Sequence, residues 1–577
     1  MLTKMHIRNF KVLRDVEIDL GKSVVLVGPN NSGKTAALQA LALWDAGLRR
    51  WNEKWGGKTA PEKRPGVTIN RRDLTAIPVR EANLLWANLH TREQTTLNGK
   101  PATKNVLIEI TVEGATEGQE WRCGLEFDYA NAESFYCRPL RTKDGGRLAI
   151  PSRPTEVPIA YLPPMSGLAA EEPRLDSGRV DVLIGEGQTA QVLRNLCWQI
   201  HQRDDDGASW QSLSDAMARL FPAKLLPPKY VAERGEITMS YRERSGPELD
   251  LSSSGRGLQQ TLLLLAYLYA NPGAVLLLDE PDAHLETLRQ RQTYNLLTEI
   301  AEERGGQLIV ATHSEVVLEE AADRHVVVAF VGRPHRIDDR GSQIRKSLRD
   351  IGFHDYYQAE QTGWVLYLEG STDFSILQAF AKSLGHPALG VLERSFVHYV
   401  CDNVQAARSH FHGLRAAKPD LVGIAIFDRL PSTMLQTESA LTEKMWARRE
   451  LENYLCDERV LLTYARGGWD LDLFAAAEAR SREEAMHEAI AEASAALATF
   501  RGLSPWSPDT KATDDFLDPL FRVYFTRLGL PSQLQKGDYH ILAHLVPRQD
   551  IDPEIVEKLD AIVAVAERAR PAESPFL

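Results

Sequence analysis

A glycine-rich segment near the N-terminus has the residue types that bind nucleotide phosphates. Residues 28–35 read Gly-Pro-Asn-Asn-Ser-Gly-Lys-Thr and match the pattern G-x-x-x-x-G-K-[ST]. In such a segment the glycines let backbone N–H groups curve around phosphate oxygens, the lysine reaches the terminal phosphates and the threonine binds Mg²⁺. We therefore predict an ATP and Mg²⁺ site whose residues are Gly28, Asn30, Asn31, Ser32, Gly33, Lys34 and Thr35.

Two carboxylates and a histidine follow apolar runs later in the first half. Residues 274–278 end at Asp279 and Glu280, and residues 308–312 end at His313. Parallel strands bring their C-terminal ends to one sheet edge, where ligands bind. At that edge Asp279 would hold Mg²⁺, Glu280 would polarise the attacking water, and His313 would contact the γ-phosphate. Taken alone, the glycine-rich segment could be an ordinary turn, and the histidine could have no special role.

The second half contains another set of carboxylates at expected strand ends. An apolar run at residues 364–368 ends at Glu369, and Asp373 follows at the start of an amphipathic helix. A further apolar run at residues 421–427 ends at Asp428. Carboxylates placed in this way can converge on one divalent cation. The alternative is structural, because Glu369 and Asp373 could simply cap a helix.

The elements that position these groups alternate between strand and helix. Period-two alternation predicts strands at residues 5–13 and 16–20, and the apolar run at 24–27 predicts a buried strand before a helix. Further strands are expected at residues 106–112 and 121–127, and helices at 188–221 and 475–498. The polar stretch 332–363 predicts a boundary between one domain at residues 1–345 and another at 362–577.

The composition is that of an ordinary globular protein. The 577 residues are 43% hydrophobic and 25% charged, which excludes disordered and collagen-like chains. The net charge of −12 restricts any contact with DNA to local basic patches, for example within residues 49–72. The five cysteines form no CxxC pair, which argues against a zinc ribbon or a disulfide framework. We find no signal peptide and no membrane span, and expect a soluble cytoplasmic protein.

A serine-rich loop before the Asp-Glu strand resembles the signature loop of ABC-type ATPases. Residues 251–260 read Leu-Ser-Ser-Ser-Gly-Arg-Gly-Leu-Gln-Gln. The resemblance implies a composite site, in which Ser254 and Gly255 of one protomer complete the ATP bound at Lys34 of another. It therefore implies at least a dimer, with a helical dimerisation insertion at about residues 165–230. Arg256 and Gly257 replace the Gly-Gln that is usual in transporters, which is closer to the recombination, SMC-type and OLD-type ATPases.

The acidic residues of the second half resemble a Toprim domain, which topoisomerases, bacterial-type primases and OLD-family nucleases share. The pattern is Glu369-Gly370-x-x-Asp373 followed by a strand ending in Asp428, but Leu430 stands where Toprim domains have a second aspartate. Residues 448–455 resemble a segment of the OLD group whose glutamates are additional metal ligands, here Glu450 and Glu452, which fall on one side if the segment is extended. Lys536 resembles the late lysine of that group, which neutralises charge on the scissile phosphate.

The order of these features resembles that of the OLD-family ATP-dependent nucleases, which are related to Gabija-type and retron-associated defence nucleases. The implied fold is α/β, with an ABC-type P-loop ATPase head and its helical insertion, then a Rossmann-like Toprim domain with a C-terminal helical extension. The resemblance implies a cytoplasmic homo-oligomer that cuts DNA with Mg²⁺ or Mn²⁺ under the control of ATP. It also implies a role in bacterial defence against phages, with DNA and a second defence-system protein as partners.

Two other interpretations remain open from the sequence. The chain could be an ATPase sensor or scaffold whose degenerate Toprim domain binds DNA or a partner without cutting, and Leu430 supports this interpretation best. A topoisomerase or a primase would need further domains and fits poorly with an ABC-type head. A competent nuclease site should bind Mn²⁺ through Glu369, whereas a sensor should keep its ATPase activity and partner binding without that residue.

Overall fold

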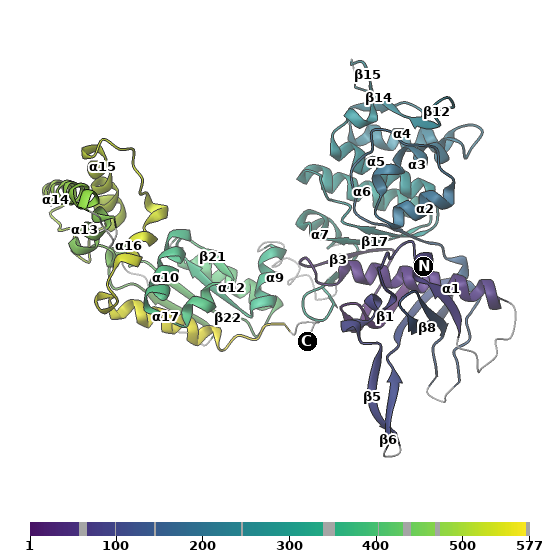
Figure 1. Ribbon diagram of the computed structural model, residues 1–577, viewed down its shortest axis with the longest axis horizontal. Coiled ribbons are helices and arrows are strands. Elements are labelled where there is room, and N and C mark those ends of the chain that lie inside the picture. The colour runs from purple at the N-terminus through teal and green to yellow at the C-terminus, as the bar shows by residue number, and fades with distance from the viewer. Residues whose placement is uncertain are drawn as a thin grey trace. The chain divides into compact units, whose positions relative to one another are not determined.

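The structure is a computed structural model that describes residues 1–56, 66–97, 100–142, 146–243, 246–322, 324–337, 352–401, 403–430, 435, 440–467 and 473–572. The chain divides into two compact units, residues 1–345 and 346–572 (Figure 1). Within the described residues, no helix is both long enough and apolar enough to cross a membrane.

Unit 1 begins with a six-stranded antiparallel sheet. Its strand order is β2-β1-β7-β8-β9-β4. In chain order the strands are β1 (Leu2–Phe10), β2 (Leu13–Asp19), β4 (Val67–Asn70), β7 (Ile108–Thr116), β8 (Gln119–Asn131) and β9 (Ser134–Pro139). One face of β1 and β2 is buried and the other is more exposed, which explains the period-two pattern of their sequences. A separate hairpin of β5 (Arg92–Leu97) and β6 (Lys100–Asn105) extends away from this sheet (Figure 1).

A second sheet in unit 1 is parallel except at one edge. Its order is β10-β16-β17-β3-β18-β19, and only β19 is antiparallel to its neighbour. The strands are β3 (Ser23–Val27), β10 (Ile159–Leu162), β16 (Val275–Asp279), β17 (Gln307–Thr312), β18 (Val326–Ala329) and β19 (His335–Arg336). The central strands are buried on both faces, so their sequences read as continuous apolar runs. The strands β3, β16 and β17 end at the same edge of this sheet, with Val27, Asp279 and Thr312 as their last residues.

Helices of unit 1 cover the parallel sheet. Helix α1 (Lys34–Trp55) follows β3 and packs against strands of both sheets, and its buried alanines and leucines join the two sheets into one core. The helices α5 (Arg256–Ala270), α6 (Thr287–Glu303) and α7 (Glu315–Ala321) connect the later strands. Helix α1 includes Arg49 and Arg50, the first two basic residues of the stretch 49–72.

The predicted helical insertion contains three helices. These are α2 (Ser177–Gly185), α3 (Leu193–His201) and α4 (Ala208–Leu220), and α3 and α4 pack against α5. Five short strands follow them, namely β11 (Ala223–Leu225), β12 (Lys229–Val231), β13 (Glu236–Thr238), β14 (Ser240–Glu243) and β15 (Glu248–Asp250). They form two small antiparallel sheets before the signature loop.

Unit 2 contains a four-stranded parallel sheet. Its order is β21-β20-β22-β23, formed by β20 (Trp364–Leu368), β21 (Val397–Tyr399), β22 (Val422–Phe427) and β23 (Leu441–Met445). Residues of β20 alternate between two helical layers: Trp364, Leu366 and Leu368 belong to the main core, while the Tyr367 hydroxyl reaches His410. Helices on both faces of a parallel sheet are the expected α/β arrangement.

The helices of unit 2 fall into two groups. On one face lie α9 (Phe353–Thr362) and α12 (Val404–Ala417). The larger group contains α10 (Ser371–Leu384), α11 (Ala388–Leu392), α13 (Glu458–Arg466), α14 (Leu473–Arg501), α15 (Asp518–Arg527), α16 (His540–Leu545) and α17 (Pro553–Ala566). The α/β fold class predicted from the sequence is confirmed. Helix α9 belongs to unit 2, so this unit begins before residue 362, where the sequence analysis placed its start.

Candidate functional site

The glycine-rich segment forms the loop between β3 and α1. Gly33 is the N-terminal cap of α1 and has a φ of 99°, a left-handed conformation that favours glycine. A Cβ atom on Gly28 would lie 2.7 Å from the carbonyl oxygen of Phe330. The loop therefore needs glycine at both conserved positions of the motif for steric reasons, and it stands at the positive end of the α1 dipole.

Lys34 and Ser32 provide polar atoms that suit a phosphate group. The Lys34 side chain is buried, and its Nζ donates hydrogen bonds to the carbonyl oxygens of Gly28 (2.7 Å) and Pro29 (2.8 Å). Burial lowers the pKa of Lys34, against the opposing effect of the Glu280 carboxylate. The Ser32 hydroxyl is buried without a hydrogen-bond partner among the described residues. A buried hydroxyl without a partner beside a lysine fits a nucleotide phosphate, which would accept from both.

Thr35 and Asp279 meet where a magnesium ion is expected. The Thr35 hydroxyl donates to Asp279 Oδ1 at 3.1 Å, and the Tyr161 hydroxyl donates to Asp279 Oδ2 at 3.3 Å. Burial raises the pKa of Asp279 to about 6, and the neighbouring Glu280 charge acts in the same direction. A buried carboxylate with a raised pKa is a site where a cation would be favourable. Tyr161 lies on β10, and the sequence analysis did not identify it.

Glu280 and His313 extend this edge of the sheet. The Glu280 backbone N–H donates to the Ala311 carbonyl oxygen at 2.8 Å, and Glu280 has a φ of 49°. Its Oε1 atom lies 3.7 Å from His313 Nδ1, and both side chains reach solvent. The sharp turn after β16 thus directs Glu280 outward while Asp279 stays buried. This arrangement suits one residue that binds a cation and one that faces a water molecule.

The signature-like loop lies at the start of α5. Gly255 is the N-terminal cap of α5, and the Ser254 hydroxyl donates to the Leu251 carbonyl oxygen at 2.7 Å. Ser254 and Gly255 line an open cavity of about 440 Å³. Within the described chain, no recorded hydrogen bond or ion pair joins Ser254 or Gly255 to Lys34 or Thr35. Their participation in an ATP site with a second protomer remains a prediction.

The acidic residues of unit 2 begin with Glu369 and Asp373. Glu369 follows β20, and Asp373 lies in the first turn of α10. Asp373 is buried, and its Oδ2 accepts a hydrogen bond from the Glu369 backbone N–H at 3.2 Å. Burial and the Glu369 charge raise the pKa of Asp373 to about 7. The N-terminal cap of α10 is Gly370, which makes no side-chain capping hydrogen bond, so Asp373 contacts the backbone just before the helix and interacts with the Glu369 charge.

Glu452 lies in a 3-10 turn and Glu450 caps it, so this segment does not meet the condition of being extended. The turn spans Leu451–Tyr454. Glu450 is its N-terminal cap and donates its backbone N–H to Asn453 Oδ1 at 2.9 Å. The Glu450 side chain accepts from the backbone N–H of Thr513. The turn forms because this cap satisfies backbone groups that an extended segment would leave free.

Glu452 is the most strongly perturbed carboxylate of this group. It is 2% exposed, and its Oε1 atom is buried without a hydrogen-bond partner among the described residues. Burial raises the pKa of Glu452 to about 8, and the charges of Glu450 and Asp373 act in the same direction. An unpartnered carboxylate oxygen beside other carboxylates is costly unless a cation is bound.

Lys536 lies near all four carboxylates. It belongs to a short 3-10 turn, Lys536–Asp538. Burial lowers the pKa of Lys536, but the charges of Glu452, Glu369, Glu450 and Asp373 outweigh this effect and raise the pKa above its ordinary value. The structure therefore brings together five of the predicted residues from separate parts of the sequence. We call the four carboxylates and Lys536 the acidic centre.

Asp428 lies at the same edge of the sheet as Glu369. It follows β22, which pairs in parallel with β20 in the register Leu366 to Ile424. Asp428 is half-buried. Leu430, at the position of the second Toprim aspartate, is also half-buried and offers no ligand atom. Any cation at this edge must therefore take its further ligands from elsewhere, and Glu450 and Glu452 are the buried carboxylates available.

Lys511 and Asp514 are close to the acidic centre but were not predicted. They form an ion pair at 2.6 Å. The hydrogen bond to Asp514 is the largest cause of a raised Lys511 pKa, burial opposes it, and the charges of Glu450 and Glu369 raise the pKa further. Lys511 precedes a π-helix, Ala512–Leu517, a rare structure that often occurs at functional sites. No pattern of spacing distinguishes this lysine from surface lysines, so only the fold could reveal it.

The acidic centre has donor atoms of the kind that a divalent cation binds, although in the described chain no three of its carboxylates bring ligand atoms within 4.8 Å of one another. Mg²⁺ and Mn²⁺ prefer carboxylate oxygens, and the centre offers several that are buried and mutually repulsive. The unpartnered Glu452 oxygen supports this assignment independently. Glu369, Asp373, Asp428, Glu450 and Glu452 are thus the candidate ligands.

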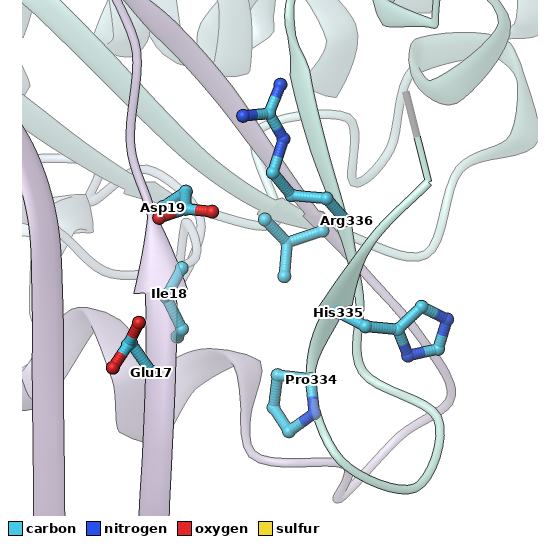
Figure 2. A pocket seen from close by; sticks show the side chains of 7 residues that line it. Glu17, Ile18, Asp19, Pro334, His335 and Arg336 are labelled. Atoms are coloured by element: carbon cyan, nitrogen blue, oxygen red, sulfur yellow. The ribbon is translucent and has the colours of Figure 1, made fainter. Parts of the chain in front are cut away.

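Two other features lie apart from these residues. Arg49 and Arg50 of the basic stretch form ion pairs with Asp45, Glu53 and Asp73, whereas residues 57–65, which include Lys58, Lys63 and Arg64, lie outside the described chain. A pocket of about 550 Å³ lies between residues 17–19 of β2 and residues 334–336, and Figure 2 shows their side chains on its two walls. None of the predicted site residues lines this pocket.

Comparisons with protein families and individual proteins agree with the nucleotide site. A family model described as "AAA domain, putative AbiEii toxin, Type IV TA system" matches residues 169–319, and one described as "AAA ATPase domain" matches residues 1–49. A protein named OLD nuclease from Thermus scotoductus is 42% identical to this chain over 43 residues. That match covers 8% of this chain and 8% of the relative's own length.

Similarity to solved structures extends over more of the chain. An SMC head bound to the C-winged helix domain of ScpA is 16% identical, with a TM-score of 0.34, and covers 58% of this chain and 97% of its own. The SMC head domain from Thermotoga maritima is 17% identical, with a TM-score of 0.29, and covers 58% and 98%. The family models, together with the loop between β3 and α1, support a P-loop ATPase head in this chain, and such a head implies nucleotide binding.

Proposed function

We propose that this chain is an ATP-regulated, metal-dependent DNA endonuclease similar to the OLD nucleases. The observation that carries the proposal is the acidic centre. Glu452 has a buried Oε1 atom without a hydrogen-bond partner among the described residues, and the charges of Asp373 and Glu450 act on it. Lys536 interacts with the charges of these three residues and of the half-buried Glu369. The same chain contains an ATPase head. An ATPase head together with an acidic centre is the combination that similarity to the OLD nucleases implies.

Each residue of the acidic centre has a distinct part in the proposed reaction. A bound Mg²⁺ or Mn²⁺ supplies an activated water and neutralises phosphate charge. Glu369, Asp373 and Asp428 would hold the cation at the sheet edge, and Glu450 and Glu452 would complete its ligands. The pKa of Lys536 is raised, so its ammonium group is protonated at neutral pH. This positive charge would neutralise charge on the scissile phosphate. Unit 2 would then be a Toprim domain in which Leu430 replaces the usual second aspartate.

ATP binding would control the cutting. We assign ATP to the loop at residues 28–35, with Thr35 and Asp279 holding Mg²⁺ and with Glu280 and His313 facing the γ-phosphate. In the proposed homo-oligomer, Ser254 and Gly255 of a second protomer complete the site. Closing such a sandwich changes the relative orientation of two heads, which is how nucleotide binding can be transmitted to an attached domain. The proposed setting is bacterial defence against phages.

The deciding experiment is cleavage of plasmid DNA by the full chain in Mg²⁺ or Mn²⁺, with and without ATP. Glu369→Ala tests the acidic centre, and Lys34→Ala tests the nucleotide site. Glu393→Ala and Lys22→Ala are matched controls, because both native side chains are exposed and lie outside the two candidate sites. We expect cutting by the parent and both controls and none by Glu369→Ala, and Lys34→Ala would show the direction of ATP control.

An intact ATPase activity without cleavage in any condition would overturn the nuclease proposal. The result would favour the second interpretation, a sensor or scaffold whose unit 2 binds DNA or a partner protein. The half-buried Leu430 in place of a carboxylate is the observation that favours it. Binding of labelled duplex DNA by the parent and by Glu369→Ala with equal affinity would support that alternative further.

A further inference from the structure

A group of two histidines and one aspartate lies in unit 2 and shares no residue with the acidic centre. Asp355 is in the first turn of α9, His398 is on β21 and His410 is on α12. Their ligand atoms all lie within 4.8 Å of one another, and all three residues are partly buried. Three separate elements therefore bring two imidazoles to one carboxylate.

The distances within this group suit a small cation. Asp355 Oδ2 lies 3.0 Å from His398 Nδ1 and 3.0 Å from His410 Nε2. Ligand atoms that are each about 2.1 Å from one metal ion lie roughly 3.0–3.4 Å apart at angles between a right angle and the tetrahedral angle. Hydrogen bonds alone also account for these distances, so the chemistry of the donors must decide between the two possibilities.

The surroundings of the histidines match those of metal ligands. The buried Tyr367 hydroxyl lies 2.9 Å from His410 Nδ1, the nitrogen that does not face Asp355. Such a partner for the second ring nitrogen fixes the ring orientation and is a regular feature of histidines that bind metals.

We infer that Asp355, His398 and His410 form a site for a first-row transition metal ion of the Zn²⁺ type. Two imidazole nitrogens and one carboxylate oxygen favour Zn²⁺, Co²⁺ or Fe²⁺ over Mg²⁺, whereas the all-oxygen acidic centre has the opposite preference. The ion would join α9 to β21 and α12. Its role is structural, because it would attach α9 to the sheet whose edge carries Glu369.

Metal binding requires one rearrangement. The two imidazole rings are stacked, with centroids 3.8 Å apart and planes 13° from parallel. The nitrogen lone pair of an imidazole lies in the plane of its ring, so two stacked rings direct their lone pairs along parallel planes. At least one ring must therefore rotate before both nitrogens can bind one ion. The His398 side chain is 32% exposed and has room to turn, whereas His410 is held between Tyr367 and Asp355.

The test is Co²⁺ titration of the metal-stripped full chain in excess Mg²⁺, which occupies oxygen-only sites. Nitrogen-bound Co²⁺ gives visible absorption bands, and Zn²⁺ should displace it. His398→Ala removes one ligand at a partly exposed position, so the fold should be retained. His386→Ala is the matched control, because His386 also lies near a carboxylate, Asp560, at 3.1 Å in the same unit.

We expect one Co²⁺ per chain in the parent and in His386→Ala, with an affinity that falls at least about tenfold in His398→Ala. Zn²⁺ should also raise the unfolding temperature of the parent but not that of His398→Ala. No Co²⁺ bands in the parent, or the same bands and affinity in His398→Ala, would overturn the inference. The group would then be held together by hydrogen bonds alone.

Discussion

Burial and neighbouring charge give single carboxylates of this chain unusual chemistry. Glu452 and Asp279 lie in different units, yet both are nearly inaccessible and both have a raised pKa for the same primary reason, burial. Thr35 and Asp279, far apart in sequence, form the hydrogen bond that the motifs imply. Perturbed groups of this kind cluster at functional sites because binding a cation or a substrate relieves their unfavourable charge.

Glu452→Gln should stabilise the metal-free protein at neutral and alkaline pH. Folded Glu452 keeps its proton up to about pH 8, whereas the unfolded chain loses it near pH 4.5. The folded state therefore binds more protons between these values, and stability falls as the pH rises through them. The glutamine variant lacks this loss and should be more stable at pH 8 by about 1–3 kcal/mol.

Thermal unfolding in the presence of EDTA measures this difference. The advantage of Glu452→Gln should shrink as the pH is lowered through 4.5, because below this value Glu452 is protonated in both the folded and the unfolded chain. Glu393→Gln, at an exposed position in the same unit, should show no such dependence. Equal destabilisation of Glu452→Gln at all pH values would contradict the account, because it would assign Glu452 a purely structural contact.

Glu280→Gln should separate ATP binding from ATP hydrolysis. Glu280 faces outward beside His313, while Lys34 and Thr35 remain in place to hold the nucleotide. Loss of a residue that polarises the attacking water costs about 10²-fold or more in rate. A fluorescent ATP analogue should therefore bind with unchanged affinity while phosphate release falls. Glu303→Gln, at an exposed position on α6, should retain both, and parent-like hydrolysis by Glu280→Gln would refute the assignment.

The sequence predicted the site residues that belong to motifs, but not the neighbouring residues that belong to none. Lys34 and Glu369 stand in spaced patterns with a chemical meaning, so they could be selected without a structure. Tyr161 could not, because an aromatic residue in an apolar strand looks like core. The group formed by Asp355, His398 and His410 was also missed, since its residues come from a helix, a strand and a second helix with no regular spacing.

Elements with strong apolar periodicity were predicted close to their observed positions. The strands at residues 24–27 and 364–368 are β3 and β20, and the alanine-rich helix is α14. The antiparallel sheet of unit 1 could not be ordered from the sequence, because β1 pairs with β7 across a long segment. The local cap at Glu450 favours a 3-10 turn, so the placement of Glu450 and Glu452 on one side of an extended segment does not apply.

Gly33→Ala tests how the start of α1 positions the phosphate loop. A Cβ at this position would lie 3.0 Å from Leu13 Cδ2, and the φ of 99° strains any residue other than glycine. We expect a loss of about 1–3 kcal/mol in unfolding free energy and weaker ATP binding. Gly178→Ala in α2 is the control, because its Cβ would meet nothing within 4 Å. It should stabilise slightly, by roughly 0.4–1 kcal/mol.

Chemical denaturation and nucleotide titration measure both effects. The two glycine variants add the same methyl group, so their comparison isolates backbone conformation and local space. Similar stability and similar ATP affinity in Gly33→Ala and Gly178→Ala would show that the loop adapts to a side chain. The argument that Gly33 fixes the phosphate loop would then fail.

At the scale of the whole molecule, the chain has two compact units with separate hydrophobic cores. One core joins α1 to both sheets of unit 1, and the other joins the sheet of unit 2 to α10 and the later helices. The sequence predicted this order, because the charged stretch 332–363 interrupts two runs of strand and helix. It placed the second start too late, since polar side chains on α9 conceal a helix that packs against the sheet.

Separate cores predict separate responses to ligands. Differential scanning calorimetry should show two unfolding transitions, with ATP raising one and Mn²⁺ in the absence of nucleotide raising the other. At ATP concentrations 100-fold above the dissociation constant, the first shift corresponds to about 2.7 kcal/mol. Lys34→Ala should remove only the ATP response. One transition that both ligands shift equally would contradict independent units.

The most direct test of the central claim is Mn²⁺ binding to the acidic centre, followed by electron paramagnetic resonance of free Mn²⁺ without nucleotide. The account predicts binding by the parent and by Glu393→Gln, and a loss of affinity of at least about tenfold in Glu369→Ala and Glu452→Gln. Removal of either carboxylate should matter because each one would be a ligand of the cation in the proposed centre. Unchanged Mn²⁺ affinity in both variants would contradict the claim that these carboxylates form a metal site.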